Sequence, residues 1–498
     1  MTQRITIDPV TRLEGHGRIE IFLDEGGEVS NAYFQVPELR GFESFCVGRH
    51  AEEMPSITNR ICGVCPEAHH MASAKALDAL FGVTCLPAAA RIREMLYSAF
   101  FVADHTTHFY CLGGPDFILG PDAPKAERNI LGVIRKVGLE TGKAVISCRA
   151  RNHELIKRLG GRGVHLCGAL PGGWSIPVTS EVQAEARLAA RQNIEFARFT
   201  LEAFHSMVLG DAAFRDLILG DLYLHRTYSM GTVDAEKAVN FYDGQIRVVD
   251  PEGLPFALYD SSDYLEHIAE HVEPWTYMKF PFLRKIGWKG MVDGGASGVY
   301  NATPLARLNV ADRMATPLAQ AEFERFYETF CGLGKGPGGR NIPVHHRLAT
   351  HWARLIELLY AAERMAELAD HPDLCDPAVR QVVEPRAGSG IGSTEAPRGT
   401  LTHHYSCDER GVLTAVNLIV GTTNNNASMG MSITRAAKGL IHRDSVTEGA
   451  LNRVEMAFRL YDPCLSCATH SLGEAPLELR VRNAVDGALL HRVRRDLD

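Results

Sequence analysis

Apolar residues recur along much of the chain with the spacing of buried helices. Residues 66–81 are rich in alanine, and Gly82 then provides a helix stop. Residues 88–112 are apolar on nearly every side, which is typical of a helix surrounded by protein. Residues 182–209 and 346–368 repeat apolar positions every 3.6 residues and keep their charges on one face. These segments predict the core of a helical bundle.

Alternating apolar and polar positions predict strands in three hairpins. The hairpins join 18–23 to 29–36, 239–242 to 245–249, and 403–407 to 412–420, each through a turn that contains Asp and Gly. Glycine- and proline-rich breaks fall at 160–173, 332–339 and 386–399. No long polar linker separates these elements. We therefore expect one α+β unit, predominantly helical, with a long-helix bundle core and small peripheral β-sheets.

Charge balance and terminal composition exclude several classes of protein. The 498 residues include 52 Lys and Arg against 60 Asp and Glu, a net charge of −8. Proteins that bind the nucleic-acid backbone usually have a basic excess, so no nucleic-acid partner is expected. No run of 18 apolar residues predicts a membrane span, and the first residues lack the layout of a signal peptide. We predict a cytoplasmic chain.

Two Cys-x-x-Cys pairs carry the strongest chemical signal. Cys62 and Cys65 precede a predicted helix, and Cys464 and Cys467 lie near the other end of the chain. Four thiolates suit zinc, nickel or an iron–sulfur cluster. The pairs are 399 residues apart (464 − 65), far beyond the roughly 12–20 residues of local zinc modules. Spacing alone leaves structural zinc, redox dithiols and a catalytic soft metal open, although ligands from distant segments are more typical of catalysis.

Ionisable residues surround both pairs. Around the first pair lie Arg60, Glu67, His69 and His70, and around the second lie Asp462 and His470. A closed structural zinc site needs no such groups, whereas a catalytic metal uses them to orient ligands and move protons. They favour the catalytic alternative.

Several motifs, in order along the chain, are shared with one family. They are DPVTRLEGH at 8–16, RGFE at 40–43, RICGVC at 60–65, GGR at 160–162 with PGG at 171–173, EAPRG at 395–399 and DPCLSCATH at 462–470. With these motifs the chain resembles the large, catalytic subunit of nickel–iron hydrogenases, and residues 34–39 are most similar to the cytosolic multisubunit members. The resemblance implies that family's fold and its reaction, the reversible splitting of dihydrogen into protons and electrons.

The resemblance also implies metal ligands and their neighbours. The four cysteines would bind nickel, and the second of each pair would bridge to an iron that carries carbon monoxide and cyanide. Arg398 would stand over the open metal position, held by the carboxylates of Asp104 and Asp462. Pro397 would shape the cavity, and the Thr422 hydroxyl would face a cyanide ligand. For Asp104, the alternative is a buried acid paired with a neighbouring histidine.

Two further residues match the family's proton-transfer and hydrogen-bonding groups. Glu14 matches a carboxylate beside a metal-bound cysteine, which would carry protons away; the alternative is an exposed turn acid. His69 lies one helical turn after Cys65 and is favoured over His70 as a hydrogen-bond donor to a cysteine sulfur.

A second, hard cation is also implied, usually magnesium. Its ligands would be Glu43, His470 and the main-chain carbonyl of Leu418. The alternative for Glu43 is a salt-bridged structural acid.

Two features depart from the family pattern. After Val420 the family has a Pro-Ser-Thr-Trp-like run, whereas this chain has GTTN at 421–424, which keeps a hydroxyl and leaves the local shape open. The chain also continues past His470, where family members are trimmed once nickel is bound. We expect residues 1–470 to form a single catalytic domain and 471–498 to be an extension that a maturation endopeptidase removes. We also expect the extension to keep the cysteine pairs apart until nickel-insertion factors supply the metal.

Electron transfer requires a partner. No cysteines outside the two pairs have cluster spacing, so we expect an iron–sulfur small subunit, with the terminal acceptor set by further electron-transfer subunits. Two other classes remain as alternatives: a hydrogen-sensing regulatory hydrogenase, and a non-catalytic subunit like that of respiratory complex I. The four cysteines argue against the second, and the 28-residue extension (498 − 470) argues against the first.

Overall fold

The computed structural model describes residues 3–332, 335–336, 339–469, 477–482 and 489–495. Its α-helices are α1 (Phe42–Cys46), α2 (Met54–Thr58), α3 (Pro66–Phe81), α4 (Pro87–Thr107), α5 (Pro115–Ile118), α6 (Ile130–Val137), α7 (Leu139–Gly160), α8 (Ser180–Phe204), α9 (Ala212–Leu219), α10 (Tyr264–His267), α11 (Pro304–Val310), α12 (Pro317–Cys331), α13 (Thr350–Ala369), α14 (Asn426–Leu440), α15 (Glu448–Arg459) and α16 (Leu465–Ala468). Its strands are β1 (Gln3–Ile7), β2 (Arg18–Leu23), β3 (Val29–Gln35), β4 (Ala169–Leu170), β5 (Gly173–Trp174), β6 (Tyr228–Val233), β7 (Gln245–Val249), β8 (Pro255–Tyr259), β9 (Ile268–His271), β10 (Phe280–Leu283), β11 (Tyr300–Asn301), β12 (Gly388–Ala396), β13 (Gly399–Cys407), β14 (Leu413–Ile419), β15 (Leu477–Arg482) and β16 (Leu489–Arg495).

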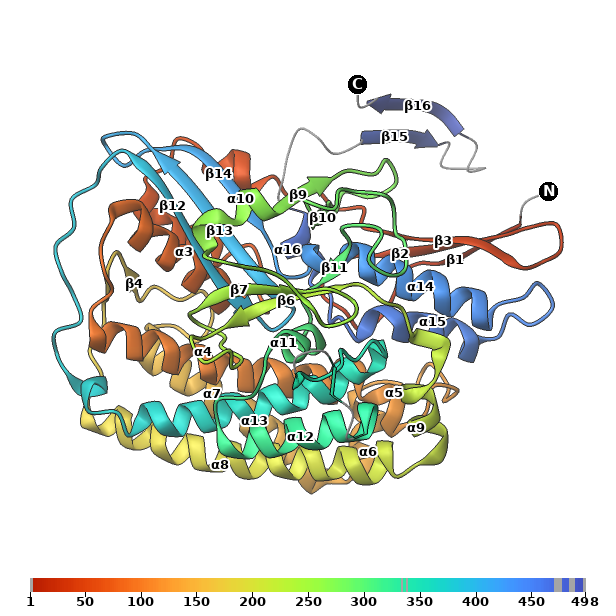
Figure 1. Cartoon of the computed structure of the whole chain (residues 1–498), viewed down its shortest axis with the longest axis horizontal. Helices are drawn as coiled ribbons and strands as arrows, with labels where there is room; N and C mark the ends of the chain where they lie inside the picture. Colours follow the sequence, from red (N-terminus) through yellow and green to blue (C-terminus); the bar gives the residue numbers. More distant parts are fainter. Residues whose placement is uncertain (1–2, 333–334, 337–338, 470–476, 483–488, 496–498) are drawn as a thin grey trace.

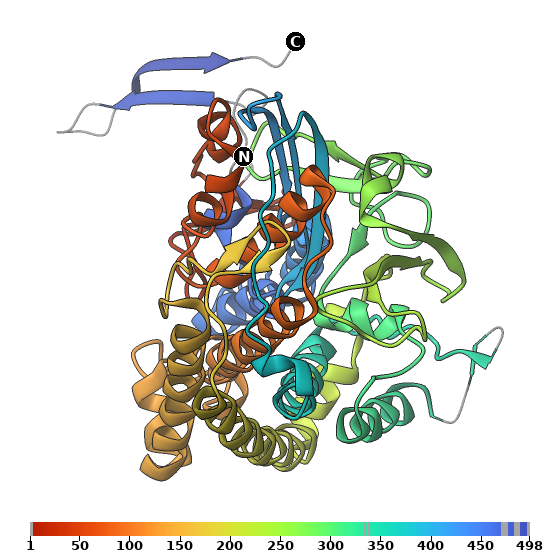
Figure 2. The ribbon, with the colours of Figure 1, turned by 90° about the vertical axis from the view of Figure 1, so that its left-hand side faces the viewer.

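The long helices form one layer in which α13 is central. α13 packs against α4, α8 and α12, and α7 packs against both α4 and α8. Figures 1 and 2 show this layer along the bottom of the molecule, below the sheets. Residues 350–363 of α13 are all buried, as a bundle core requires. The helices expected at 88–112 and 182–209 are α4 and α8, and each continues as a short π-helical turn, η2 (His108–Gly113) and η3 (His205–Leu209).

The helix that follows the first cysteine pair has the expected bounds. α3 begins at Pro66, whose missing N–H costs nothing in the first turn of a helix. It ends before Gly82, which adopts a left-handed conformation with φ of 62°. Thirteen of its sixteen residues are buried, so α3 lies inside the molecule rather than on its surface.

The first and third predicted hairpins are confirmed, because β2 pairs with β3 and β13 pairs with β14, both antiparallel. The expected break at 386–399 is wrong for most of its length, since β12 lies there and pairs with β13. The glycines of β12 let its backbone touch α3. A methyl group on Gly390 or Gly392 would overlap the α3 backbone near Ala76. A glycine-rich segment is therefore a strand here, held close to a helix.

The second predicted hairpin is wrong in its first strand. β7 pairs with β6 and β8, whereas Val239 forms only an isolated bridge with Val233 and residues 241–244 form a bend. The side-chain oxygen of Asn240 accepts the N–H groups of Tyr242 and Asp243, which replaces strand pairing by a local turn. Phe241 stacks on Phe101 of α4, with 3.8 Å between the ring centroids, so its apolar side chain packs against the helical layer.

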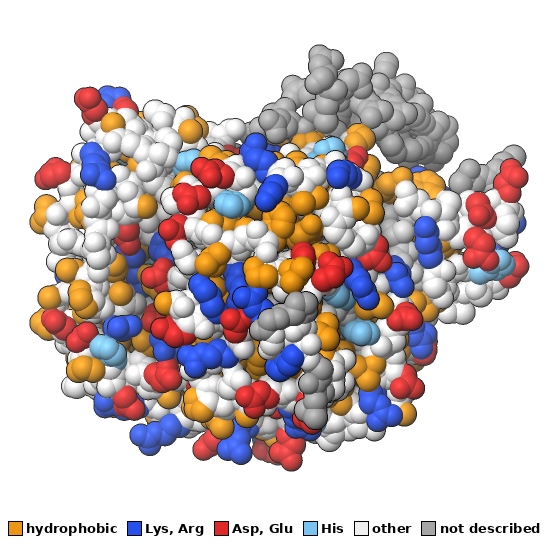
Figure 3. Space-filling view, viewed as in Figure 1, with side chains coloured by type: hydrophobic (Ala, Val, Ile, Leu, Met, Phe, Trp, Pro, Cys, Tyr) orange, Lys and Arg blue, Asp and Glu red, His pale blue; other side chains and the backbone are white. Residues whose placement is uncertain are grey.

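The last features of the fold are its surface and the strands near the C-terminus. On the face shown in Figure 3, acidic and basic side chains are interspersed without a large basic patch among the described residues. No helix in the described parts of the chain is long and apolar enough to cross a membrane. β15 and β16 pair with each other, and Figures 1 and 2 show them at the edge of the molecule.

Candidate metal centre

The two cysteine pairs meet in the folded chain. Cys62 and Cys65 lie in the turn before α3, and Cys464 and Cys467 lie at the short helix α16. The Sγ atom of Cys464 is 3.1 Å from that of Cys62 and 2.9 Å from that of Cys467, and Cys65 is 3.4 Å from Cys467. All four sulfur atoms lie within 4.8 Å of one another, and all four residues are buried. The fold thus makes one four-sulfur cluster from the two ends of the chain.

The N-terminal segment holds the second pair in place. The Leu465 N–H donates to the carbonyl oxygen of Glu14 at 3.0 Å, and the Ser466 N–H donates to its Oε2 at 3.1 Å. The same Oε2 accepts from the Cys464 thiol at 3.1 Å. Gly15 has φ of 85°, and a Cβ there would lie 2.8 Å from that of Leu465, so only glycine permits this approach. Glu14 is therefore in direct contact with the cluster.

The cluster fits a soft metal ion. Burial raises the pKa of the Cys464 and Cys467 thiols well above their usual range. The pKa of Cys62 is lowered instead, because its hydrogen-bond contacts with the other cluster sulfurs, above all that of Cys464, favour its thiolate. Several thiolates could not share this buried position without a positive charge, and a bound metal cation ionises its thiol ligands. Four sulfur donors are the ligand set that soft metals such as nickel prefer.

Arg398 lies between the two predicted carboxylates. Its Nη1 donates to Asp104 Oδ2 at 3.0 Å, and its Nη2 lies 2.9 Å from Asp462 Oδ2. Its Nε donates to the Asp462 carbonyl oxygen at 2.8 Å. Burial lowers the pKa of Arg398, but the two carboxylates outweigh this effect and raise it well above its usual range. The alternative for Asp104 is not observed, because His105 bonds Glu357 at 3.0 Å instead.

Sequence reasoning missed the residues that fix the backbone around Arg398. Arg307 and Arg354 both donate to the carbonyl oxygen of Pro397 at 3.3 Å. The Asn425 amide donates to the carbonyl oxygen of Arg398 at 2.6 Å. Pro397 itself is buried in this setting. The available signal was a pair of charged residues three positions apart, Arg354 and Glu357, within a predicted core helix.

Residues 421–424, where the sequence departs from the family pattern, have a defined structure. The Thr422 hydroxyl accepts the Cys464 N–H at 3.0 Å, so it lies beside the cluster. The Asn424 amide donates to the carbonyl oxygen of Thr400 at 2.5 Å. The segment is therefore held by side-chain amides against β13.

The two adjacent histidines have different surroundings. The Ala169 N–H donates to His70 Nε2 at 3.0 Å, so Nδ1 carries the proton and donates to the carbonyl oxygen of Pro55 at 2.9 Å. His69 instead pairs with His403 at 3.1 Å. Backbone groups occupy both nitrogen atoms of His70, which makes it a structural residue.

Two of the three predicted ligands of a hard cation lie together. The Leu418 N–H of β14 donates to Glu43 Oε1 at 2.7 Å. His470 lies outside the described residues. The expected role of the extension in keeping the cysteine pairs apart concerns the chain before metal arrives, and it stays a prediction.

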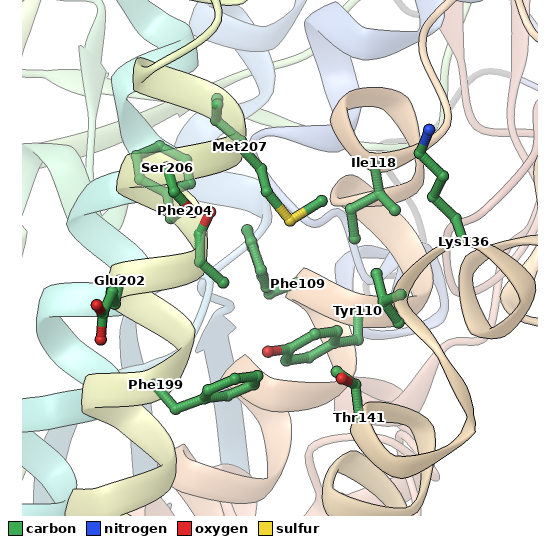
Figure 4. A pocket seen from close by; sticks show the side chains of 13 residues that line it. Phe109, Tyr110, Ile118, Lys136, Thr141, Phe199, Glu202, Phe204, Ser206 and Met207 are labelled. Atoms are coloured by element: carbon green, nitrogen blue, oxygen red, sulfur yellow. Dashed lines mark hydrogen bonds between the residues drawn. The ribbon is translucent and has the colours of Figure 1, made fainter.

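An apolar cavity of 450 Å³ lies apart from this cluster, between η2 and η3. Figure 4 shows Phe109 and Tyr110 of η2 on one side and Phe199 and Met207 on the other. The Tyr110 hydroxyl bonds Thr200 at 3.0 Å. None of the predicted site residues lines this cavity, so it is not part of the metal centre.

Comparison with known proteins decides the family. A model described as nickel-dependent hydrogenase matches residues 40–134 and 302–470, and one described as HoxL-like matches residues 4–39. The chain belongs to the nickel-dependent hydrogenase family. The matched ranges include all four cysteines and Arg398.

Relatives of this hydrogenase chain align over nearly its whole length. An iron-sulfur subunit of the F420-non-reducing hydrogenase of Archaeoglobus profundus is 42% identical over 494 residues, which are 99% of each chain. The NAD-reducing hydrogenase HoxS subunit beta of Cupriavidus necator is 37% identical over 509 residues, covering 99% of this chain and 100% of that protein. A crystal structure of an NAD+-reducing NiFe-hydrogenase in the H2-reduced state matches with a TM-score of 0.86 and 37% identity, covering 94% of this chain and 100% of that chain.

These comparisons confirm three predictions: the resemblance, the α+β and predominantly helical fold, and the enzyme class. The chain is a nickel–iron hydrogenase large subunit, whose reaction is the reversible oxidation of dihydrogen. Its four-cysteine cluster is the group that suits nickel and iron.

Proposed function

We propose that Cys62, Cys65, Cys464 and Cys467 would together hold one nickel and one iron. The iron would carry carbon monoxide and cyanide ligands, which no side chain supplies. The observation that supports this is the contact among four buried sulfur atoms from opposite ends of the chain. When bound, the ions supply the Lewis acid that dihydrogen, which is apolar and barely acidic, needs for its cleavage.

Glu14 would carry the proton away. Its Oε2 lies 3.1 Å from the Cys464 sulfur, within reach of direct proton transfer. The Ser466 N–H holds the same oxygen in place. Cys464 is buried and Glu14 is partly exposed, so this carboxylate connects the cluster with the surface.

Arg398 would place a fixed positive charge beside the thiolates. Asp104 orients its guanidinium by a charge-assisted hydrogen bond, and the Asp462 carboxylate does so by an ion pair. Pro397 would shape the space beside it, and the Thr422 hydroxyl would lie toward a cyanide ligand. His69 would donate a hydrogen bond to a cysteine sulfur.

A magnesium ion would be held by Glu43, the carbonyl oxygen of Leu418 and His470. Carboxylate and carbonyl oxygen atoms are ligands that this cation prefers. The contact between Glu43 and Leu418 supports the proposal, since it brings β14 and α1 together at one place.

Electrons would pass to an iron–sulfur small subunit seated over the first cysteine pair. Val64 lies between the two cysteines and is 42% exposed, and Phe45 nearby in the sequence is 55% exposed. Phe45, Arg40 and Arg60, among others, line a hollow of 760 Å³. Exposed aromatic and arginine side chains are enriched in protein interfaces. The relatives are named as subunits, which supports a partner, and further subunits would set the electron acceptor.

Maturation would remove residues 471–498 from a catalytic domain formed by 1–470. The family match ends at residue 470, and the solved hydrogenase chain covers 94% of this chain while being covered completely itself. A maturation endopeptidase and nickel-insertion factors would act on the full-length form. The cytoplasmic location expected from the sequence stays a prediction.

Metal analysis with infrared spectroscopy of the copurified complex tests the proposed function. We expect nickel and iron in equal amounts and absorption bands of iron-bound diatomic ligands. Cys464→Ser should lose nickel, whereas Cys148→Ser, at a buried cysteine outside the cluster, should keep it. One zinc per chain without such bands would contradict the proposal.

A further inference from the structure

A second buried guanidinium, that of Arg354, lies behind the Arg398 ion pairs. Arg354 belongs to α13, and its side chain is fully buried. Its Nη1 is 3.6 Å from Asp462 Oδ2, the oxygen that also pairs with Arg398. We propose that Arg354 is a positioning residue for the hydrogenase reaction, which fixes the Asp462 carboxylate and, through it, the Arg398 guanidinium. This inference rests on the proposed function of Arg398.

Arg354 also joins the two backbone segments that carry these residues. Its Nη1 donates to the carbonyl oxygen of Pro397 at 3.3 Å, and its Nη2 donates to that of Leu460 at 3.0 Å. Pro397 directly precedes Arg398, and Leu460 lies two residues before Asp462. A guanidinium is planar and rigid, so one side chain sets the spacing between the segments. A lysine ammonium would keep the charge but could not span both carbonyl oxygens and the Asp462 carboxylate.

Charge balance gives an independent reason. Asp104 and Asp462 supply two negative charges, and Arg398 and Arg354 supply two positive ones. Without Arg354, one cation would face two buried carboxylates, and the set would become net negative beside the thiolates. Buried charges interact strongly because little water screens them.

Infrared bands of iron-bound diatomic ligands report such a change. A more negative surrounding increases electron donation from the iron into these ligands, which weakens their internal bonds and shifts the bands to lower wavenumber. A loss of geometry acts on the rate instead, since misplacement of a catalytic group by about 1 Å can cost about 100-fold. The two consequences can therefore be measured separately.

The test compares Arg354→Met and Arg354→Lys with the same substitutions at Arg93, all in the copurified complex. Arg93 is a matched control because its side chain is also fully buried and pairs with one carboxylate, that of Asp78, at 2.5 Å. It donates to two carbonyl oxygens as well, those of Leu170 and Gly173, at 2.8 and 2.9 Å. Nickel content is measured for every variant, and rates are expressed per nickel.

We expect Arg354→Met to shift the bands to lower wavenumber and to reduce kcat for dihydrogen oxidation by about 10- to 100-fold, with a smaller change in KM. Arg354→Lys should return the bands to their wild-type position but restore only part of the rate. The Arg93 variants should keep both the bands and the rate per nickel, even where their thermal midpoint falls.

Wild-type bands and a wild-type rate in nickel-loaded Arg354→Met would overturn the inference, as would an equal band shift in Arg93→Met. If Arg354→Met binds no nickel, the result for Arg354→Lys tests the inference instead. A reduced rate per nickel with unshifted bands supports the positioning role, and a wild-type rate rejects it. Absence of diatomic bands in the wild-type complex would instead contradict the proposed function itself, and the inference with it.

Discussion

At the scale of single residues, Glu14 has the contact with the clearest chemical consequence. Its carboxylate touches the Cys464 sulfur but is not a ligand of the cluster. Glu14→Gln keeps the size and the hydrogen-bonding oxygen of the side chain while removing its ability to take up a proton at neutral pH. We expect dihydrogen/deuterium exchange to slow by about 100-fold or more while nickel stays bound.

The control for this prediction is Glu28→Gln, an exposed carboxylate between β2 and β3. It should leave both exchange and nickel content unchanged. Wild-type exchange in Glu14→Gln would remove Glu14 from the proton path, and loss of nickel would show that it supports the cluster itself.

Buried His70 predicts a dependence of stability on pH. Burial lowers its pKa to about 4, against about 6.5 in an unfolded chain. Between these values the unfolded chain binds more protons, so the free energy of unfolding decreases as pH falls from 6.5 to 4. His70→Gln removes this titration and should flatten the slope by up to about 1.4 kcal/mol per pH unit.

Denaturant unfolding at several pH values between 4 and 6.5 measures that slope. His50→Gln, at an exposed histidine, serves as the control and should leave the slope as it is in the wild type. An unchanged slope in His70→Gln would mean that His70 is protonated in the folded chain.

At the scale of elements, the contact between β12 and α3 sets the position of two site segments. α3 follows Cys65 directly, and β12 leads into Pro397 and Arg398. Gly392→Ala would place a methyl group against the α3 backbone and force the strand away from the helix. We expect a loss of about 1–3 kcal/mol in the free energy of unfolding, together with reduced nickel content.

The matched substitution lies in the same strand. A Cβ at Gly388 would be 3.7 Å from the carbonyl oxygen of Leu80, an ordinary contact, so Gly388→Ala should be nearly neutral. Equal stability of the two variants in denaturant unfolding would show that β12 and α3 can separate at little cost.

These elements also show which parts of the fold local sequence patterns can predict. Local signals suffice for α3, because Pro66 and Gly82 mark its ends and the residues between them share one conformation. Local signals fail for β12. In the sequence its glycines indicate a break, but in the fold they allow a close contact with α3. Likewise, Arg354 lies in a core helix that the sequence predicts correctly. Its hydrogen-bond partners Pro397 and Leu460 are 43 and 106 residues away in the sequence, so no local pattern indicates them.

At the scale of the whole molecule, the metal centre depends on the meeting of the chain's two ends. Glu14 and Cys464 form an isolated parallel bridge although 450 residues separate them. The cysteine spacing indicates shared ligation, and the family motifs imply its chemistry, but the contacts among the four sulfur atoms exist only in the complete fold. Nickel binding should therefore report on global folding as well as on the ligands.

Removal of the extension, residues 471–498, is the prediction at the scale of the whole molecule. The family match ends at residue 470, and trimming is expected once nickel is bound, so it should depend on a complete set of cysteine ligands. We expect the intact mass of the nickel-loaded large subunit to end at His470. Cys464→Ser, which cannot complete the cluster, should keep all 28 residues (498 − 470), while Cys148→Ser should be trimmed like the wild type. Active enzyme whose mass includes Asp498, or equal trimming of Cys464→Ser, would show that the extension does not respond to nickel.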